Sequence, residues 1–104
     1  MRRSVEIHVL EILDVLGSSE AVQPMATNLL KMGDKYGVLD SKNPLGEAAG
    51  VVYIAGILTN HPVTLAVIAE KAGISPETVR NFKTYLASEL KTKKEWPSLP
   101  PKGK

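Results

Sequence analysis

Apolar residues recur every three or four positions along most of this chain, the spacing that places them on one face of an α-helix. The pattern predicts an all-α fold of five helices. Near the start, Val5, Ile7 and Val9 also alternate, which leaves open a short strand there. The predicted helices cover residues 4–16, 20–36, 44–59, 64–72 and 76–90, and Gly17-Ser18-Ser19 breaks the first and caps the second.

Turn residues separate the predicted helices. Gly17 ends the first helix, and Gly37 ends the second before a polar loop at residues 40–43. The third helix, between Pro44 and Thr59, is apolar nearly all round, and Glu47 is its only charged residue. A helix of that character is buried on most sides, so we expect the third helix to be buried.

The last two helices form a predicted helix-turn-helix over residues 64–90. Thr64 suits the start of its first helix. Gly73 suits the left-handed conformation that ends a helix. Ser75 then has the chemistry of an N-cap, and Pro76 falls at the first helical position, where a missing N–H costs nothing. These residues predict a tight turn between two helices.

Each helix of this unit has one apolar face, which we expect to lie in the core. Ala69 and Gly73 are also small where the two crossing helices must approach closely. The apolar faces consist of Leu65, Ile68, Ala69 and Ala72 in the first helix and Val79, Phe82, Leu86 and Leu90 in the second. The opposite face of the second helix consists of Glu77, Arg80, Asn81, Thr84 and Ser88.

This polar face has two interpretations. Any amphipathic surface helix has a solvated face. Arginine and asparagine are also the side chains that form bidentate hydrogen bonds to guanine and adenine edges. The net charge of +2 and the isoelectric point near 8.9 permit a nucleic-acid partner without requiring one.

Composition narrows the chemistry further. The hydrophobic fraction of 43% is enough for a core, and the absence of cysteine excludes disulfides, cysteine-ligated zinc and thiol catalysis within these residues. His8 and His61 are far apart and have no third ligand at metal spacing. The sequence has no phosphate-binding or nucleophile motif and no apolar run long enough to span a bilayer. We therefore expect no enzymatic activity, cofactor, metal site, small-molecule substrate or membrane partner.

Residues 91–104 form a predicted basic, proline-rich tail after a domain at residues 1–90. Its prolines exclude a continuous helix, and its lysines favour solvation. The tail is either a loosely ordered terminus or a basic extension that contacts phosphates or a partner. Trp96 is the exception, because a lone exposed tryptophan is uncommon and this side chain can fold back onto the domain.

Four short runs, in this order and spacing, resemble a known family. Residues 43–55, NPLGEAAGVVYIA, resemble a family run of proline, small residues and Tyr-Ile-Ala, and residues 68–70, 73–75 and 78–81 follow as IAE, GIS and TVRN. Together they are similar to the second cyclin-like repeat of transcription initiation factor IIB, particularly its archaeal form, transcription factor B. The resemblance covers residues 19–90 well and the first helix weakly. It implies a five-helix cyclin-like fold with a C-terminal helix-turn-helix.

The resemblance also implies a role in transcription initiation. In that family, two cyclin-like repeats bind the complex of TATA-binding protein with promoter DNA and help to recruit RNA polymerase. The helix-turn-helix of the second repeat lies in the major groove upstream of the TATA box. The implied partners are therefore double-stranded promoter DNA, TATA-binding protein and RNA polymerase. The implied location is the cytoplasm of an archaeon, at the nucleoid, or a eukaryotic nucleus.

On this resemblance, the base-contacting positions of the family fall on Glu77 and Arg80. Arg80 matches the family pattern, whereas Glu77 stands where the family has an apolar valine. A carboxylate at this position either accepts a hydrogen bond from cytosine N4 or repels phosphates. The candidate DNA-binding residues are Ser75, Glu77, Thr78, Arg80, Asn81 and Thr84.

Family members also begin with a cysteine-ligated zinc ribbon, a linker that reaches into polymerase and a first cyclin-like repeat, none of which occurs in this sequence. We expect the chain to be an excised domain rather than a short natural relative. The alternative function is a cyclin-box protein-interaction module without DNA-binding activity. In that module the helix-turn-helix is only packing, and a partner groove lies beside the third helix.

Overall fold

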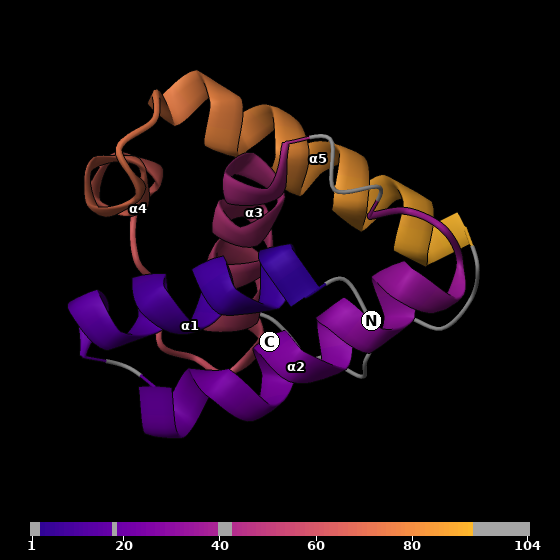
Figure 1. Ribbon diagram of the computed structural model, residues 1–104, viewed down its shortest axis with the longest axis horizontal. Helices are drawn as coiled ribbons and strands as arrows, with labels where there is room; N and C mark the ends of the chain where they lie inside the picture. The colour runs from indigo at the N-terminus through magenta and orange to yellow at the C-terminus, as the bar shows by residue number, and fades with distance from the viewer. Residues whose placement is uncertain (1–2, 18, 40–42, 93–104) are drawn as a thin grey trace.

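The computed structural model describes residues 3–17, 19–39 and 43–92, and within these residues it contains five helices and no strand (Figure 1). The predicted all-α fold is therefore confirmed. Most of the predicted polar loop and of the basic tail, including Trp96, lies outside the described residues. The helices are α1 (Arg3–Leu16), α2 (Ser19–Lys35), α3 (Pro44–Leu58), α4 (Leu65–Ala72) and α5 (Pro76–Thr92).

Val5, Ile7 and Val9 lie in α1, so the strand that their alternating pattern left open does not form. Val5 and Val9 are 0% and 1% exposed, whereas Ile7 is 49% exposed. Residues two apart in a helix point about 200° away from each other, and residues four apart lie on the same face. The alternation of these three residues therefore fits one buried and one exposed face of α1.

Helix α3 is the centre of the core, as its apolar composition predicts. It packs against each of the other four helices (Figure 1), and eleven of its fifteen residues are buried. Asn43 caps its start, since the amide of Gly46 donates to the Asn43 Oδ1 at 3.2 Å. The buried Glu47, 4% exposed, lies in the first turn, where the helix dipole favours a negative charge. No helix among the described residues is both long and apolar enough to cross a bilayer.

Two glycines on successive turns of α3 allow α5 to approach it closely. A Cβ atom at Gly50 would lie 3.1 Å from the backbone nitrogen of Lys83 and 3.2 Å from the carbonyl carbon of Phe82. At Gly46, one turn earlier, an added Cβ would lie 2.6 Å from the ring of Phe82. A side-chain ring can turn aside, but a helix backbone moves only with its whole element. Gly50 therefore determines how close the two helices lie.

We expect Gly50→Val to lower the free energy of unfolding by about 1–3 kcal/mol, because the new side chain overpacks the α3–α5 contact. Urea denaturation monitored by circular dichroism measures this loss. Ala21→Val is the control, since it adds the same side chain at an exposed position of α2. Equal stabilities of the two variants would contradict a tight contact at Gly50.

Candidate nucleic-acid interface

The turn between α4 and α5 closes through two backbone hydrogen bonds. The amide of Gly73 donates to the carbonyl of Glu70 at 3.2 Å, and the amide of Ile74 donates to that of Ala69 at 3.0 Å. This pair of bonds is the Schellman motif, which needs a left-handed residue at its corner. Gly73 supplies it with a φ of 76°, so the predicted helix end is confirmed.

The second expectation for Gly73, a close approach of the two helices, is wrong. A Cβ atom added there would meet nothing within 4 Å. Gly73 is required by its backbone conformation alone, because L-residues with a side chain are strained at positive φ. Ala69, 1% exposed, is the small residue that lies inside the core.

The starts of both helices carry the predicted caps. The amide of Val67 donates to the Thr64 hydroxyl at 3.2 Å, at the start of α4. The amide of Thr78 donates to the Ser75 hydroxyl at 3.2 Å, at the start of α5. The hydroxyls of Ser75 and Thr78 are also hydrogen-bonded to each other at 2.9 Å. These side chains satisfy amides that have no partner within their helices.

The predicted apolar faces lie in the core. Ile68 in α4 and Val79, Leu86 and Leu90 in α5 are each no more than 2% exposed. Leu65, Ala72 and Phe82 are partly buried. With one face of α5 in the core and its start capped, the rotation of this helix about its own axis is determined. The direction of its polar face follows from that rotation.

The polar face of α5 points to solvent. Glu77, Arg80, Asn81 and Thr84 are all exposed, and their i, i+3, i+4, i+7 spacing places them on one side of the helix. Ser75 and Thr78, the other two candidates, lie at the cap and bond to each other. The structure thus groups the six candidate residues as four on an open face and two at the helix N-terminus beside it.

One contact beside this face has no counterpart in the sequence-based prediction. The Lys83 ammonium lies over the Tyr53 ring, 5.8 Å from its centroid, and joins α5 to α3. Thirty positions separate the two residues, so no local pattern indicates that they meet. The sequence offers one weak signal for this contact. Lys83 follows the apolar Phe82 in α5, and the predicted buried helix α3 contains Tyr53.

Both histidines have local roles in the structure. The Nδ1 of His8 donates to the Glu11 carboxylate at 3.2 Å, and the Nδ1 of His61 donates to the Thr59 carbonyl at 2.8 Å. Among residues 3–17, 19–39 and 43–92, no three His, Cys, Asp or Glu side chains come together as metal ligands would.

Sequence comparisons identify the relatives of this chain, although no protein-family model matches it. The chain is 36% identical over 84 residues to transcription initiation factor IIB of Sulfurisphaera tokodaii. These 84 residues are 81% of this chain and 27% of that protein. It is 41% identical over 76 residues to transcription initiation factor IIB 6 of Halobacterium salinarum. The aligned residues are 73% of this chain and 24% of that protein. This chain is homologous to part of transcription initiation factor IIB.

The resemblance inferred from the sequence motifs is therefore confirmed. Transcription initiation factor IIB of Pyrococcus furiosus is likewise 36% identical over 86 residues, 83% of this chain and 29% of that factor. The chain spans about a quarter of the length of the relatives it matches, which fits a single cyclin-like repeat of factor IIB. These relatives are named as transcription initiation factors and not as enzymes.

We expect Ser75→Ala to lower the free energy of unfolding by about 1 kcal/mol, because the amide of Thr78 loses its side-chain acceptor and keeps only the Ser75 carbonyl at 3.1 Å. Thermal unfolding followed by circular dichroism measures the change. Ser88→Ala makes the same substitution at an exposed position in the second half of α5, where alanine is the better helix former. An equal or larger loss in Ser88→Ala would contradict the capping role of Ser75.

Proposed function

We propose that this chain is the promoter-binding module of a general transcription initiation factor. In this proposal it corresponds to the second cyclin-like repeat, and α5 enters the major groove upstream of the TATA box. It acts with TATA-binding protein and helps to recruit RNA polymerase. The observation that carries the proposal is the exposed polar face of α5, held by a buried opposite face, in a chain homologous to factor IIB.

The dimensions of α5 support this proposal. An α-helix is roughly 10–12 Å across with its side chains, and the major groove is about 12 Å wide. Helix-turn-helix proteins place the N-terminal residues of the second helix against base edges. Here Glu77 to Thr84 occupy the first half of α5. At about 1.5 Å per residue these positions extend over roughly 10 Å, the length of about three base pairs.

Five of the six candidate residues have a defined chemical role in such a complex. Arg80 pairs in a bidentate manner with guanine, and Asn81 pairs similarly with adenine. The Thr84 side chain offers a hydroxyl and a methyl group to the same groove. Ser75 and Thr78 lie at the N-terminus of α5, where amides and the helix dipole favour a phosphate. In this proposal Arg80, Asn81 and Thr84 recognise the base sequence. Ser75 and Thr78 position the helix on the phosphates.

We expect Arg80→Ala to weaken binding to cognate promoter DNA by about 1–3 kcal/mol, the contribution of one bidentate contact to a base. Fluorescence anisotropy with a labelled duplex at low salt measures the loss. Lys31→Ala is the control, because it removes one positive charge from an exposed site on α2. Arg80→Lys keeps the charge but not the planar fork, so its affinity should fall between those of the unchanged chain and Arg80→Ala.

The same titrations are repeated with TATA-binding protein present, because a single repeat lacks the companion repeat found in the family. Binding should weaken steeply as the salt concentration rises, since contacts with phosphates release counterions. If Arg80→Ala and the chain itself bind promoter DNA equally well in the presence of TATA-binding protein, Arg80 does not read a base.

We expect Glu77→Gln to strengthen binding to duplexes of every sequence, because the exposed carboxylate at the start of α5 faces the phosphates as α5 enters the groove. Affinities for a set of duplexes that differ at single positions measure this effect. Glu70→Gln, an exposed carboxylate on α4, is the control. A loss of affinity confined to duplexes with a cytosine at one position would instead show that Glu77 accepts from its N4.

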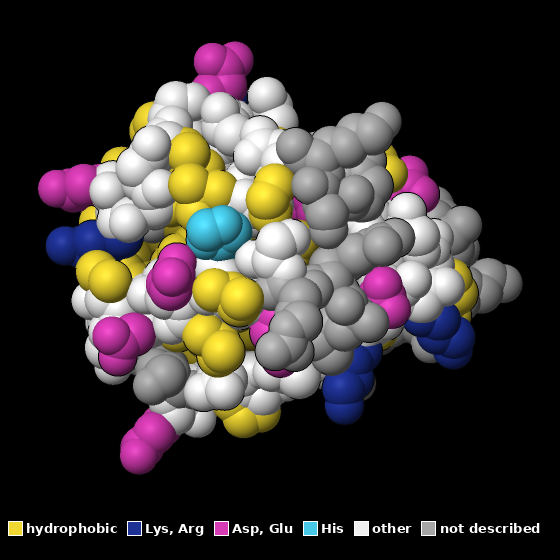
Figure 2. Space-filling model, viewed as in Figure 1, with side chains coloured by type: hydrophobic (Ala, Val, Ile, Leu, Met, Phe, Trp, Pro, Cys, Tyr) yellow, Lys and Arg dark blue, Asp and Glu magenta, His cyan; other side chains and the backbone are white. Residues whose placement is uncertain are grey.

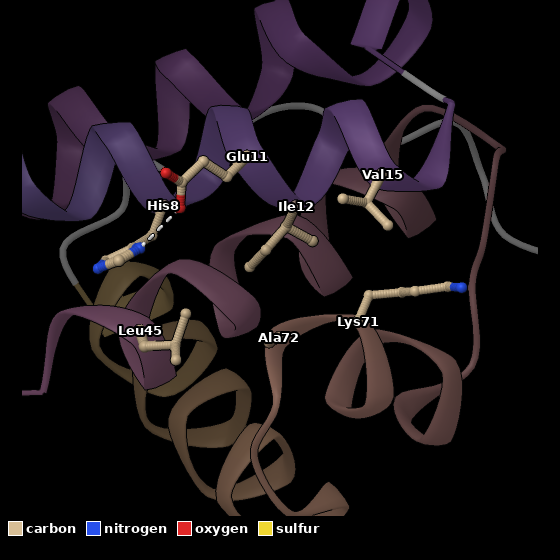
Figure 3. A pocket seen from close by; sticks show the side chains of 7 residues that line it. All are labelled: His8, Glu11, Ile12, Val15, Leu45, Lys71 and Ala72. Carbon is tan, nitrogen blue, oxygen red and sulfur yellow. Dashed lines mark hydrogen bonds and ion pairs between the residues drawn. The ribbon is translucent and has the colours of Figure 1, made fainter.

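One observation favours the alternative of a protein-interaction module. A groove of about 290 Å³ lies between α1, the first turn of α3 and the end of α4 (Figure 3). His8, Val15, Leu45 and Lys71 are among the residues that line it. This module would bind a partner beside α3 and would show no DNA affinity even at low salt. The DNA titrations described above therefore distinguish the two functions.

A further inference from the structure

The solvent side of α1 is unusually apolar. Among the described residues, six large hydrophobic side chains are exposed, and three of them lie on this helix. Ile7, Leu10 and Val15 are 49%, 40% and 57% exposed. Figure 2 shows hydrophobic side chains gathered on the face where α1 lies at the front. Single exposed apolar residues are ordinary, but a group on one helix indicates a surface that another segment covers.

The same side of α1 is acidic. Glu6, Glu11 and Asp14 alternate with the apolar side chains, and Arg3 at the start is the only lysine or arginine of α1. Glu11 also pairs with His8, so Glu6 and Asp14 are the carboxylates of this helix that have no partner among the described residues. We call this surface the α1 outer face. It consists of Glu6, Ile7, Leu10, Glu11, Asp14 and Val15. A segment that covers it must supply apolar side chains together with positive charges.

The C-terminal tail has this composition. The chain continues for twelve residues after Thr92, and residues 93–104 contain four lysines and one glutamate, a net charge of 4 − 1 = +3 from side chains. Trp96 and Leu99 are the large apolar residues of that stretch. They lie between a pair of lysines at 93 and 94 and another pair at 102 and 104.

The tail is also long enough to reach the α1 outer face from the end of α5. Twelve extended residues span up to about 40 Å, whereas the longest dimension of the domain is 31 Å. In Figure 1 the last turn of α5 lies at the right edge of the molecule, and the first turn of α1 lies closer to that edge than its last turn does. Ile7 and Leu10 belong to the first half of α1, so they are the nearer part of the outer face for Trp96.

We propose that the C-terminal tail is the segment that covers the α1 outer face. Trp96 packs on Ile7 and Leu10, and the lysines on either side of it face the carboxylates of Glu6 and Asp14. The indole removes apolar surface from water, and the opposite charges fix which way the tail lies. The proposal concerns α1 and the tail only, so it stands or falls independently of DNA binding by α5.

Trp96 is the only tryptophan of the chain, so its fluorescence reports the environment of the tail directly. In the full chain we expect emission at shorter wavelength than that of a solvated indole, and weak quenching by acrylamide. Leu10→Glu should shift the emission to that of a solvated indole and increase quenching, because it places a charge under the ring. Ile57→Glu is the matched control, since Ile57 is 38% exposed but lies on α3. It should leave the emission unchanged.

Three results would overturn the proposal. The first is emission of a solvated indole in the unchanged chain, and the second is an equal response in Leu10→Glu and Ile57→Glu. The third is a shift that appears only as the protein concentration rises, with dimers in sedimentation velocity, because a second copy would then cover α1. Far-UV circular dichroism confirms that each variant is folded, and Leu10→Gln provides a milder second variant that should shift the emission in the same direction.

Discussion

The approach of α5 to α3 at Gly50 determines the position of the candidate DNA-binding helix. A Cβ atom there would meet the backbone of α5, at the nitrogen of Lys83 and the carbonyl carbon of Phe82. Protein interiors are close-packed, so adding volume at such a contact displaces a whole helix instead of one side chain. Helix α3 is buried and packs against the other four helices, so it cannot move aside to make room for the added volume. The position of the exposed face of α5 is therefore set by the packing of the opposite side of this helix against α3.

Helix ends determine the remaining geometry. The bonds that close α4 at Gly73 and Ile74 recur after α3, where the amide of His61 donates to the Gly56 carbonyl at 2.7 Å and Asn60 adopts a φ of 66°. A Cβ at Gly56 would lie 2.9 Å from the His61 carbonyl oxygen, so the chain folds back tightly there. Helix α4 is thus fixed at both ends by backbone turns. In the part of the chain that the structure describes, positive φ occurs at Asn60 and at three glycines, residues that tolerate a left-handed conformation.

The features that sequence analysis predicted are local ones. Helical spacing gave the buried faces, and Thr64, Gly73 and Ser75 act through neighbours only a few positions away. The features it missed depend on how distant segments meet: Gly50 contacts α5 and Lys83 contacts Tyr53, whereas Gly73 has no close neighbour where one was expected. Periodicity shows which residues share the exposed face of α5, since rotation along a helix is regular. The bases this face would contact depend on the geometry of a complex, so their assignment comes from family resemblance and stays a prediction.

The two sides of α5 have separate roles, and this has a consequence for how the helix can evolve. Val79, Leu86 and Leu90 are buried and hold the domain together, whereas Glu77, Arg80, Asn81 and Thr84 are exposed and contribute no core volume. Substitutions at exposed positions usually change stability by no more than about 0.5 kcal/mol. Mutation can therefore explore many side chains on the outer side of one rigid helix without unfolding the protein. A glutamate at position 77, where the family resemblance implies a valine, is the kind of substitution that such a scaffold tolerates.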